Sequence, residues 1–354
     1  MADEKSIVYN GSLVYNGVSL GHIGCLPWPF HHPSMYTIEG SPPSIELLEV
    51  APRDGLQMQT QPLPTQRKIE LIQRLLAAGL RRIEVTSFVN PKKVPQMADA
   101  EALLRALPPP PGVCFTGLVM NHKGFERALA AGCNEIGMVV VASDTFNRRN
   151  QGVGTAESIE AWLAIARAAH SVGLRVQVTV SAAFGCPFEG EVPLDRVLEI
   201  TERVAQGKPH EICFADTIGV GVPAQVKALI ARVRARLPEI PLRCHFHNTR
   251  NTGLANAFAA FESGVQTLDA SLGGIGGCPF APAATGNIAS EDLVYMLERS
   301  GVRTGIDLEA LIDTARWLEQ TLGAPAPGML IRAGSFPRGA AAAAQGAGRF
   351  STAH

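Results

Sequence analysis

Two histidines separated by one residue are the strongest candidate for chemistry in this sequence. His245 and His247 close the strand-like run 242–248. Because side chains two positions apart on a strand point to the same side, both imidazoles share one face. Neutral imidazole is a good ligand for divalent metals. The spacing alone fits half of a metal site and two ordinary histidines near a strand end equally well.

The strands and helices that must position these histidines are predicted to alternate along the chain. Eight strand-like runs end in polar or glycine-rich stretches, and amphipathic helical patterns lie between them. The runs are Ile45–Val50, Arg82–Thr86, Val113–Val119, Glu135–Val141, Arg175–Ser181, Glu211–Ala215, Leu242–His247 and Thr267–Ser271. This alternation predicts an α/β fold, the (β/α)8 TIM barrel. A doubly wound open sheet is the alternative, which the lack of G-x-G-x-x-G after the first strand weakens.

The chain divides into three parts. Residues 1–43 form an N-terminal extension to which we assign no role, and residues 44–323 form the barrel domain with extra C-terminal helices. These helices are predicted at Ser290–Leu297 and Asp307–Leu322, and the second either caps the barrel or contacts another subunit. Residues 324–354 are rich in Pro, Gly and Ala, a composition that predicts a disordered tail.

The composition excludes several classes of protein. The 354 residues carry a formal net charge of -1 without a basic stripe, which argues against a nucleic-acid partner. No apolar run reaches the roughly 18 residues of a membrane span, so we expect no membrane partner. The seven cysteines are scattered and form no C-x-x-C pair, and the N-terminus resembles no signal peptide. We therefore expect a protein of the reducing cytoplasm.

Four residues of metal-ligating types fall at strand ends, where TIM barrels build their active sites. Asp54 follows the first strand, the two histidines end the seventh, and Asn287 follows the eighth. These strands are neighbours around a closed barrel, so the four side chains are expected to converge. Their nitrogen and oxygen ligands suit Mg, Mn or Zn and leave positions open for substrate oxygens.

Other polar residues at strand ends have plain structural alternatives. Arg53 is the expected partner of Glu84, whose carboxylate is costly inside the barrel unless it is paired. Asp216 ends the sixth strand, and Cys278 follows the glycine-rich stretch Gly273–Gly277. Taken singly, such an aspartate is equally often structural, such a stretch is often a turn, and such a cysteine is more often inert than reactive.

From Ile45 to Leu322 the chain resembles the hydroxymethylglutaryl-CoA lyases. These are metallolyase TIM barrels, a group that also contains the isopropylmalate and homocitrate synthases. The motifs that carry the resemblance are Pro52–Gln57, Ile83–Val89, Pro95–Met97, Gly185–Gly190, Asp216–Gly221, His245–His247, Gly276–Ala281, Thr285–Asn287 and Glu291–Leu297. They are specific, and they cover nearly the whole barrel and its following helices.

The resemblance implies a site, residue by residue. The ligands of a divalent cation, usually Mg or Mn, are matched by Asp54, His245, His247 and Asn287. Among the catalytic groups, Arg53 matches the arginine that stabilises enolate charge, and Cys278 matches a thiol on a mobile loop. Glu84 and Asp216 match acids that support the site, with Asp216 near the reacting hydroxyl. His245 is expected to act in proton transfer as well as in metal binding.

The implied reaction is cleavage of 3-hydroxy-3-methylglutaryl-CoA to acetyl-CoA and acetoacetate, a step of leucine degradation. The tertiary hydroxyl loses its proton while the C–C bond breaks in a retro-Claisen sense, and a divalent cation makes such a hydroxyl more acidic. Arg53 stabilises the enolate, and an acid such as Cys278 protonates the acetyl-CoA carbanion. Closure of a glycine-hinged loop would exclude water. The expected partners are a small-molecule acyl-CoA and further copies of the chain in a homo-oligomer.

The chain departs from the family near the expected acyl group. Thr60 stands where many relatives have a lysine that helps hold the acyl carboxylate. Arg250 lies in Asn248–Asn251, where the family usually has Asp-Thr-Tyr-Gly, and its guanidinium suits a carboxylate or a CoA phosphate. Arg148 and Arg149 either lie near CoA or solvate a loop. The predicted substrate-binding residues are Arg53, Gln57, Arg148, Arg149 and Arg250.

These departures leave alternatives open for the substrate. The first interpretation is a hydroxymethylglutaryl-CoA lyase, and the second is a lyase for citramalyl-CoA or a branched hydroxyglutaryl-CoA. A condensing synthase is a different class, against which the Cys278 loop argues. A third class is a non-catalytic protein that binds acyl-CoA or metal. Such a protein would have to retain the complete set of catalytic and metal-ligating residues without using it for a reaction.

Overall fold

The computed structural model describes residues 14–15, 18–19, 42–277 and 286–336. Two compact units divide the chain, Met1–Pro42 and Pro43–His354. In the first, the two-residue strands β1 (Val14–Tyr15) and β2 (Val18–Ser19) pair antiparallel. The predicted extension, residues 1–43, to which no role is assigned, stays a prediction.

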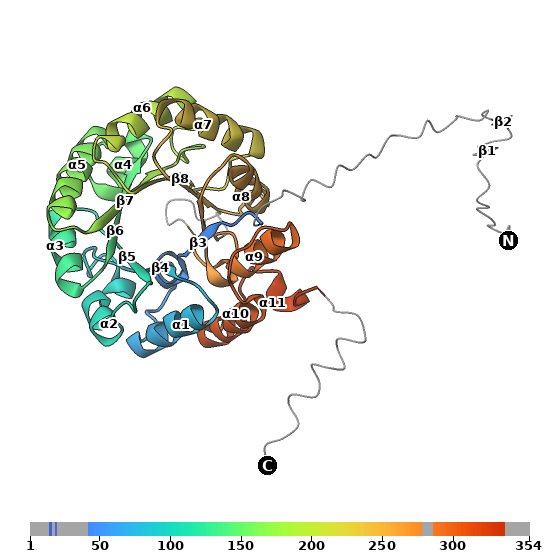
Figure 1. Ribbon diagram of the computed structural model, residues 1–354, viewed down its shortest axis with the longest axis horizontal. Helices are drawn as coiled ribbons and strands as arrows, with labels where there is room; N and C mark the ends of the chain where they lie inside the picture. Colours follow the sequence, from blue (N-terminus) through green and yellow to red (C-terminus); the bar gives the residue numbers. More distant parts are fainter. Residues whose placement is uncertain (1–13, 16–17, 20–41, 278–285, 337–354) are drawn as a thin grey trace, which may run out of the picture. The chain divides into compact units, whose positions relative to one another are not determined.

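Eight parallel strands close into a barrel in the second unit, with β10 paired to both β3 and β9. Helices surround this barrel (Figure 1). The strands are β3 (Glu46–Glu49), β4 (Arg82–Ser87), β5 (Cys114–Leu118), β6 (Glu135–Val141), β7 (Arg175–Ser181), β8 (Glu211–Asp216), β9 (Leu242–Phe246) and β10 (Thr267–Ala270). The predicted (β/α)8 TIM barrel is confirmed, and the open sheet is excluded.

Alternation along β7 shows how one strand serves two surfaces. Val176, Val178 and Val180 are fully buried members of the apolar core. Gln177 and Thr179 alternate with them and line the cavity inside the barrel. Since a strand sends successive side chains to opposite faces, the apolar residues pack beneath the helices while polar residues fill the interior.

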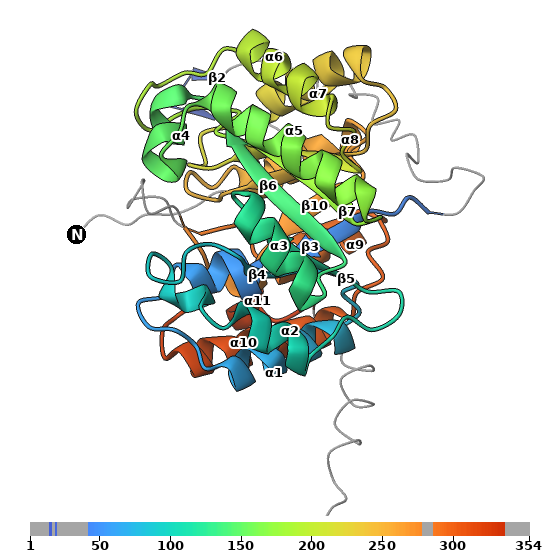
Figure 2. The same cartoon turned by 90° about the vertical axis from the view of Figure 1, so that its left-hand side faces the viewer.

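The helices cover the outside of the barrel, and Figure 2 shows α3 and α5 beside β6. The helices are α1 (Thr65–Ala77), α2 (Ala100–Ala106), α3 (His122–Ala131), α4 (Asp144–Gln151), α5 (Thr155–Ser171), α6 (Leu194–Ala205), α7 (Pro223–Arg236), α8 (Gly253–Glu262), α9 (Ser290–Arg299), α10 (Leu308–Leu322) and α11 (Leu330–Ala333). Both predicted extra helices are present, and α10 packs against α1 and α9 of its own barrel. Among the described helices, none is long and apolar enough to span a membrane.

Residues 324–336 pack on the barrel, so the prediction of a disordered tail from residue 324 does not hold for this stretch. Ala326 and Ile331 are buried in the core. The amide of Gly328 donates to the carbonyl of Gly273 at 2.9 Å. A few well-placed apolar residues and backbone hydrogen bonds thus anchor a segment whose composition alone predicts disorder. Residues 337–354 of the predicted tail lie outside the described residues.

Buried charges fill the lower half of the barrel interior. Arg82 on β4 lies 2.8 Å from a carboxylate oxygen of Glu135 and 3.0 Å from one of Glu211. Arg243 on β9 reaches the same Glu211 at 2.7 Å. All four side chains are almost completely buried. Charges in such a place are stable only because each one has an opposite partner within hydrogen-bond distance.

Removing the shared cation should therefore destabilise the barrel. Arg82→Ala leaves two buried carboxylates without this partner, and we expect it to lower the free energy of unfolding by about 3–5 kcal/mol. Arg148→Ala breaks only an exposed pair with Asp144 and should cost less than about 1 kcal/mol. Urea unfolding of both variants measures the difference. Equal losses would show that the buried network is not a stabilising feature.

Candidate active site

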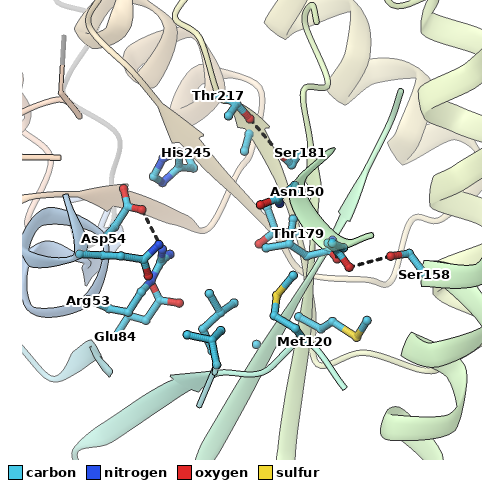
Figure 3. A pocket seen from close by; sticks show the side chains of 18 of the residues that line it. Arg53, Asp54, Glu84, Met120, Asn150, Ser158, Thr179, Ser181, Thr217 and His245 are labelled. Carbon is cyan, nitrogen blue, oxygen red and sulfur yellow. Dashed lines mark hydrogen bonds and ion pairs between the residues drawn. The ribbon is translucent and has the colours of Figure 1, made fainter. Parts of the chain in front are cut away.

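A cavity of about 660 Å³ opens at the C-terminal ends of the barrel strands. Figure 3 shows Arg53, Asp54, Glu84 and His245 gathered on one side of it. Asn150, Thr179 and Ser158 lie on the other side. The cavity thus joins a charged region to a largely neutral polar one, which suits a substrate with a reactive end and an extended remainder.

Three predicted metal ligands meet at the charged end. One ligand atom from each of Asp54, His245 and His247 can be chosen so that all lie within 4.8 Å of one another. Asp54 comes from η1 (Ala51–Gly55), the single turn after β3, and the histidines come from the end of β9. Closure of the barrel brings these segments together although they lie almost 200 positions apart in the chain.

The turn η1 is held close to the eighth strand's loop by a glycine. A Cβ atom at Gly55 would lie 2.6 Å from Cγ1 of Ile275, too close for any real side-chain contact. The amide of Asp54 donates to the carbonyl of Val50 at 2.8 Å. A larger residue at position 55 would force the side chain of Ile275 to move, and the carbonyl of Ile275 accepts a hydrogen bond from Asn287.

Asn287, the fourth predicted ligand, lies beside Asp54. Its Nδ2 donates to Oδ2 of Asp54 at 2.8 Å and to the carbonyl of Ile275 at 3.1 Å. Its Oδ1 is buried without a hydrogen-bond partner among the described residues, as is Nδ1 of His247. Two buried lone pairs beside a carboxylate fit a divalent cation, since such atoms are costly without a partner.

The electrostatics of the group also suit a cation. Burial and the neighbouring His245 lower the pKa of His247 to about 4, so its imidazole is neutral at pH 7 and able to bind metal. Burial would raise the pKa of Asp54, but Arg53 and the two histidines outweigh it and hold that pKa below its usual value. Asp54 is therefore ionised, as a ligand must be.

Arg53 and Glu84 form the predicted pair at the cavity wall. Nη2 of Arg53 lies 2.6 Å from Oε2 of Glu84, and Nη1 lies 2.7 Å from Oδ1 of Asp54. Two carboxylates therefore fix the plane of the guanidinium. Held in this way, Arg53 presents a cation beside the metal-ligating group without being free to turn into solvent.

Other predicted site residues hold loops rather than line the cavity. Both oxygens of Asp216 accept amide hydrogens, from Val220 at 2.9 Å and from Gly221 at 2.8 Å. Arg250 donates to the carbonyl of Gly219 at 3.0 Å, in the same loop. Neither Asp216 nor Arg250 is among the residues that line the cavity. Their contacts fix the loop after β8, next to the histidines of β9.

The two arginines of α4 also lie outside the cavity lining. Arg148 pairs with Asp144 at 2.8 Å, and the guanidinium of Arg149 lies 4.2 Å from the ring centre of Phe188. Gln57, by contrast, lines the cavity, and its Oε1 is buried without a partner among the described residues. Cys278 lies outside the described residues, directly after the cavity-lining Gly277.

Sequence reasoning missed several polar residues inside the barrel. Asp269, Gln177, Thr179 and Arg243 all line the cavity. They lie within strands rather than after them, so a search of strand ends passes over them. The available signal was polar alternation, since Arg243 stands two positions before His245 and therefore shares its face.

The ligand set predicts how metal binding depends on each residue. His247→Ala should abolish stoichiometric binding of Mn²⁺, because it removes one of the three converging ligands. His122→Ala is the matched control, since His122 is exposed at the start of α3, pairs with Glu126 and is not among the residues that line the cavity. Equilibrium dialysis with metal analysis measures both. Full Mn²⁺ occupancy in the His247 variant would contradict the ligand assignment.

Comparisons with known proteins agree with this geometry. A family model described as HMGL-like matches residues 44–318. The chain is 48% identical to the (R)-citramalyl-CoA lyase of Chloroflexus aurantiacus, across 82% of this chain and 95% of that protein. It is 42% identical to the hydroxymethylglutaryl-CoA lyase of Pseudomonas mevalonii, across 79% and 93%.

A solved structure gives the same result. The HMG-CoA lyase of Acinetobacter baumannii, in complex with coenzyme A and 3-methylmalate, superposes with a TM-score of 0.79 at 41% identity. The match covers 83% of this chain and 98% of that one. By sequence, fold and the residues gathered at its cavity, the chain belongs to the HMGL-like family of carbon–carbon lyases.

Proposed function

We propose that this lyase cleaves 3-hydroxy-3-methylglutaryl-CoA to acetyl-CoA and acetoacetate with the help of a divalent cation, Mg²⁺ or Mn²⁺. The observation that carries the proposal is the meeting of Asp54, His245 and His247 beside Arg53 at one cavity. Relatives named hydroxymethylglutaryl-CoA lyase, at 40 to 42% identity, support the substrate. The expected cytoplasmic location and homo-oligomeric state stay predictions.

The bonds that change define what the site must do. The O–H bond of the tertiary alcohol breaks, and its electron pair forms the ketone of acetoacetate. The adjacent C–C bond breaks at the same time, and its electrons pass to the acetyl-CoA enolate, which a proton then quenches at carbon. The bound cation supplies Lewis acidity toward the substrate oxygens. The residues of the chain must therefore accept the hydroxyl proton, stabilise an enolate and deliver one proton to its carbon.

Arg53 is the group suited to the enolate. Its guanidinium is permanently charged, lines the cavity and is oriented by Glu84 and Asp54. A donor fixed before the reaction stabilises developing negative charge without having to reorganise. We therefore assign Arg53 the thioester oxygen and Glu84 the task of orienting Arg53.

The proton donor is proposed to be Cys278, which lies outside the described residues. Its support comes from the neighbouring chain. Gly277 lines the cavity, and Gly273, Gly274 and Gly276 have positive φ angles of 68°, 69° and 126°. Glycine adopts such angles without strain, so this approach can carry the chain to the cavity edge. The role of His245 in proton transfer also stays a prediction.

A second substrate is favoured by two observations. The relative at 48% identity is named (R)-citramalyl-CoA lyase. In this chain, Met58 lines the cavity in the segment where Thr60 replaces the expected lysine. Citramalyl-CoA is one methylene shorter and would yield pyruvate in place of acetoacetate. One methylene in an apolar pocket changes selectivity only about 10- to 200-fold, so both esters belong in the assay.

A substrate panel tests the proposal. With Mg²⁺ or Mn²⁺, the protein should release acetyl-CoA and acetoacetate from hydroxymethylglutaryl-CoA, with a kcat/KM above that for citramalyl-CoA. Release of pyruvate from citramalyl-CoA alone would select the second substrate. Cleavage of neither ester, by protein that binds Mn²⁺, would refute both assignments.

Variants test the two catalytic roles. Arg53→Lys should lower kcat about 10²- to 10³-fold with a smaller change in KM, because lysine cannot keep both carboxylate contacts and reach the substrate. Arg148→Lys should retain activity, since Arg148 does not line the cavity. Cys278→Ser should lower kcat by orders of magnitude and leave the Mn²⁺ content unchanged. Full activity in the cysteine variant would exclude the thiol as proton donor.

A further inference from the structure

The two histidines of the metal-ligating group are held in different ways. Asp269 on β10 is in register with His245 on β9, and Nδ1 of His245 lies 3.1 Å from Oδ2 of Asp269. Nδ1 is thus occupied by a carboxylate of the barrel, which leaves Nε2 for another ligand. Nδ1 of His247 has no hydrogen-bond partner among the described residues. Of the two histidines, only His245 has a hydrogen bond from Nδ1, among the described residues, that fixes the orientation of its ring.

Asp269 is itself held rigidly. Arg243 stands two residues before His245 on β9, and its Nη1 forms an ion pair with Oδ2 of Asp269. Nε of Arg243 donates to Glu211 at 2.7 Å, so the guanidinium is anchored on its other side. Asp269 and Arg243 are both almost completely buried. The carboxylate therefore cannot turn away from His245 toward water.

The direction of the hydrogen bond follows from charge. Beside the arginine, Asp269 is a carboxylate, and a carboxylate can only accept hydrogen bonds. Nδ1 of a neutral His245 must then carry the proton, and Nε2 must carry the lone pair. A carboxylate behind a metal-binding histidine generally fixes the tautomer in this way and makes the ligand more basic.

We propose that Asp269 is the positioning residue of the metal centre, holding His245 as the Nδ1–H tautomer with Nε2 directed to the cation. This inference rests on the metal centre of the proposed function and deepens it. The competing view is that Asp269 merely balances the charge of Arg243 inside the barrel. The two views differ in what happens when the charge is removed but the shape is kept.

Glu135 provides a matched control for such a change. It is as buried as Asp269 and belongs to the same set of interior charges through Arg82, at 2.8 Å. Thr116 and Cys114 donate to its Oε2, and among the described residues it forms no hydrogen bond or ion pair with His245 or Arg243. Glu135→Gln therefore removes one buried charge without touching the hydrogen bond to the histidine.

The experiment compares Asp269→Asn with Glu135→Gln in the full-length protein. In Asp269→Asn the side-chain oxygen can keep both contacts, because Arg243 and Nδ1 of His245 meet the same Oδ2, so the variant removes the negative charge behind the imidazole and keeps its hydrogen bond. Mn²⁺ affinity, measured by electron paramagnetic resonance titration, should fall about 10- to 100-fold. Glu135→Gln should bind Mn²⁺ like the wild type. In [¹⁵N]histidine-labelled protein, a neutral His245 should carry its proton on Nδ1 both in the wild type and in Asp269→Asn, because the oxygen that accepts from Nδ1 is kept.

Each outcome bears on the inference. Above the raised pKa of His245, a neutral imidazole that carries its only ring N–H proton on Nε2 in the wild type overturns it without any variant, which covers the case in which Asp269→Asn does not fold. Unchanged Mn²⁺ affinity in Asp269→Asn overturns it, and so does an equal loss in Glu135→Gln. If the wild type binds no Mn²⁺, the proposed metal centre itself fails, which separates that failure from the failure of the positioning role.

Discussion

Parallel pairing of β10 with both β3 and β9 is the constraint on which the rest of the site depends. This closure sets Asp269 opposite His245 and Ala270 opposite Glu49. Segments from the beginning and the end of the barrel thereby share one edge. Asp54, the two histidines and Asn287 would otherwise be separated along the chain, and no local interaction among them could bring them together.

Closure of the barrel also buries charged side chains away from water, and each of them is stabilised by an ion pair with a neighbour of opposite charge. The barrel encloses Arg82, Glu135, Glu211, Arg243 and Asp269, all with little contact to water. Each cation lies between carboxylates, and the alternation runs upward from the bottom of the barrel to His245. Such pairs stabilise only when complete, so the same network that satisfies the interior also fixes the orientation of the upper charges.

Much of the fold and part of the site were predictable from the sequence. The alternation of strand and helix patterns predicts the barrel, because each strand repeats the same apolar face. The convergence of Asp54 with the histidines follows from chain order in a closed barrel. The ties of Asp216 and Arg250 to the loop after β8 could not be predicted, because they depend on where backbone amides and carbonyls point. Asp269 was missed because its importance comes from a neighbouring strand.

The residues of the reacting centre are different from the residues of the cavity wall that would contact the acyl group of the substrate. Arg53, Asp54 and the two histidines lie at the charged end of the cavity, whereas Met58 lines the wall in the segment where Thr60 stands in place of the lysine expected from the family resemblance. Similarity to lyases of two acyl-CoA esters is consistent with this division. A fixed reacting centre next to a separate wall for the acyl group would allow one fold to accept acyl groups that differ by a methylene.

Pulsed electron paramagnetic resonance of the Mn²⁺-loaded protein tests the central claim most directly. The spectrum should show couplings to two histidine nitrogens, and a coupling to ¹³C when hydroxymethylglutaryl-CoA labelled at its tertiary carbon is added. That result would place metal, histidines and the reacting carbon in one site. Mn²⁺ without nitrogen coupling, or a labelled ester that leaves the spectrum unchanged, would contradict the account.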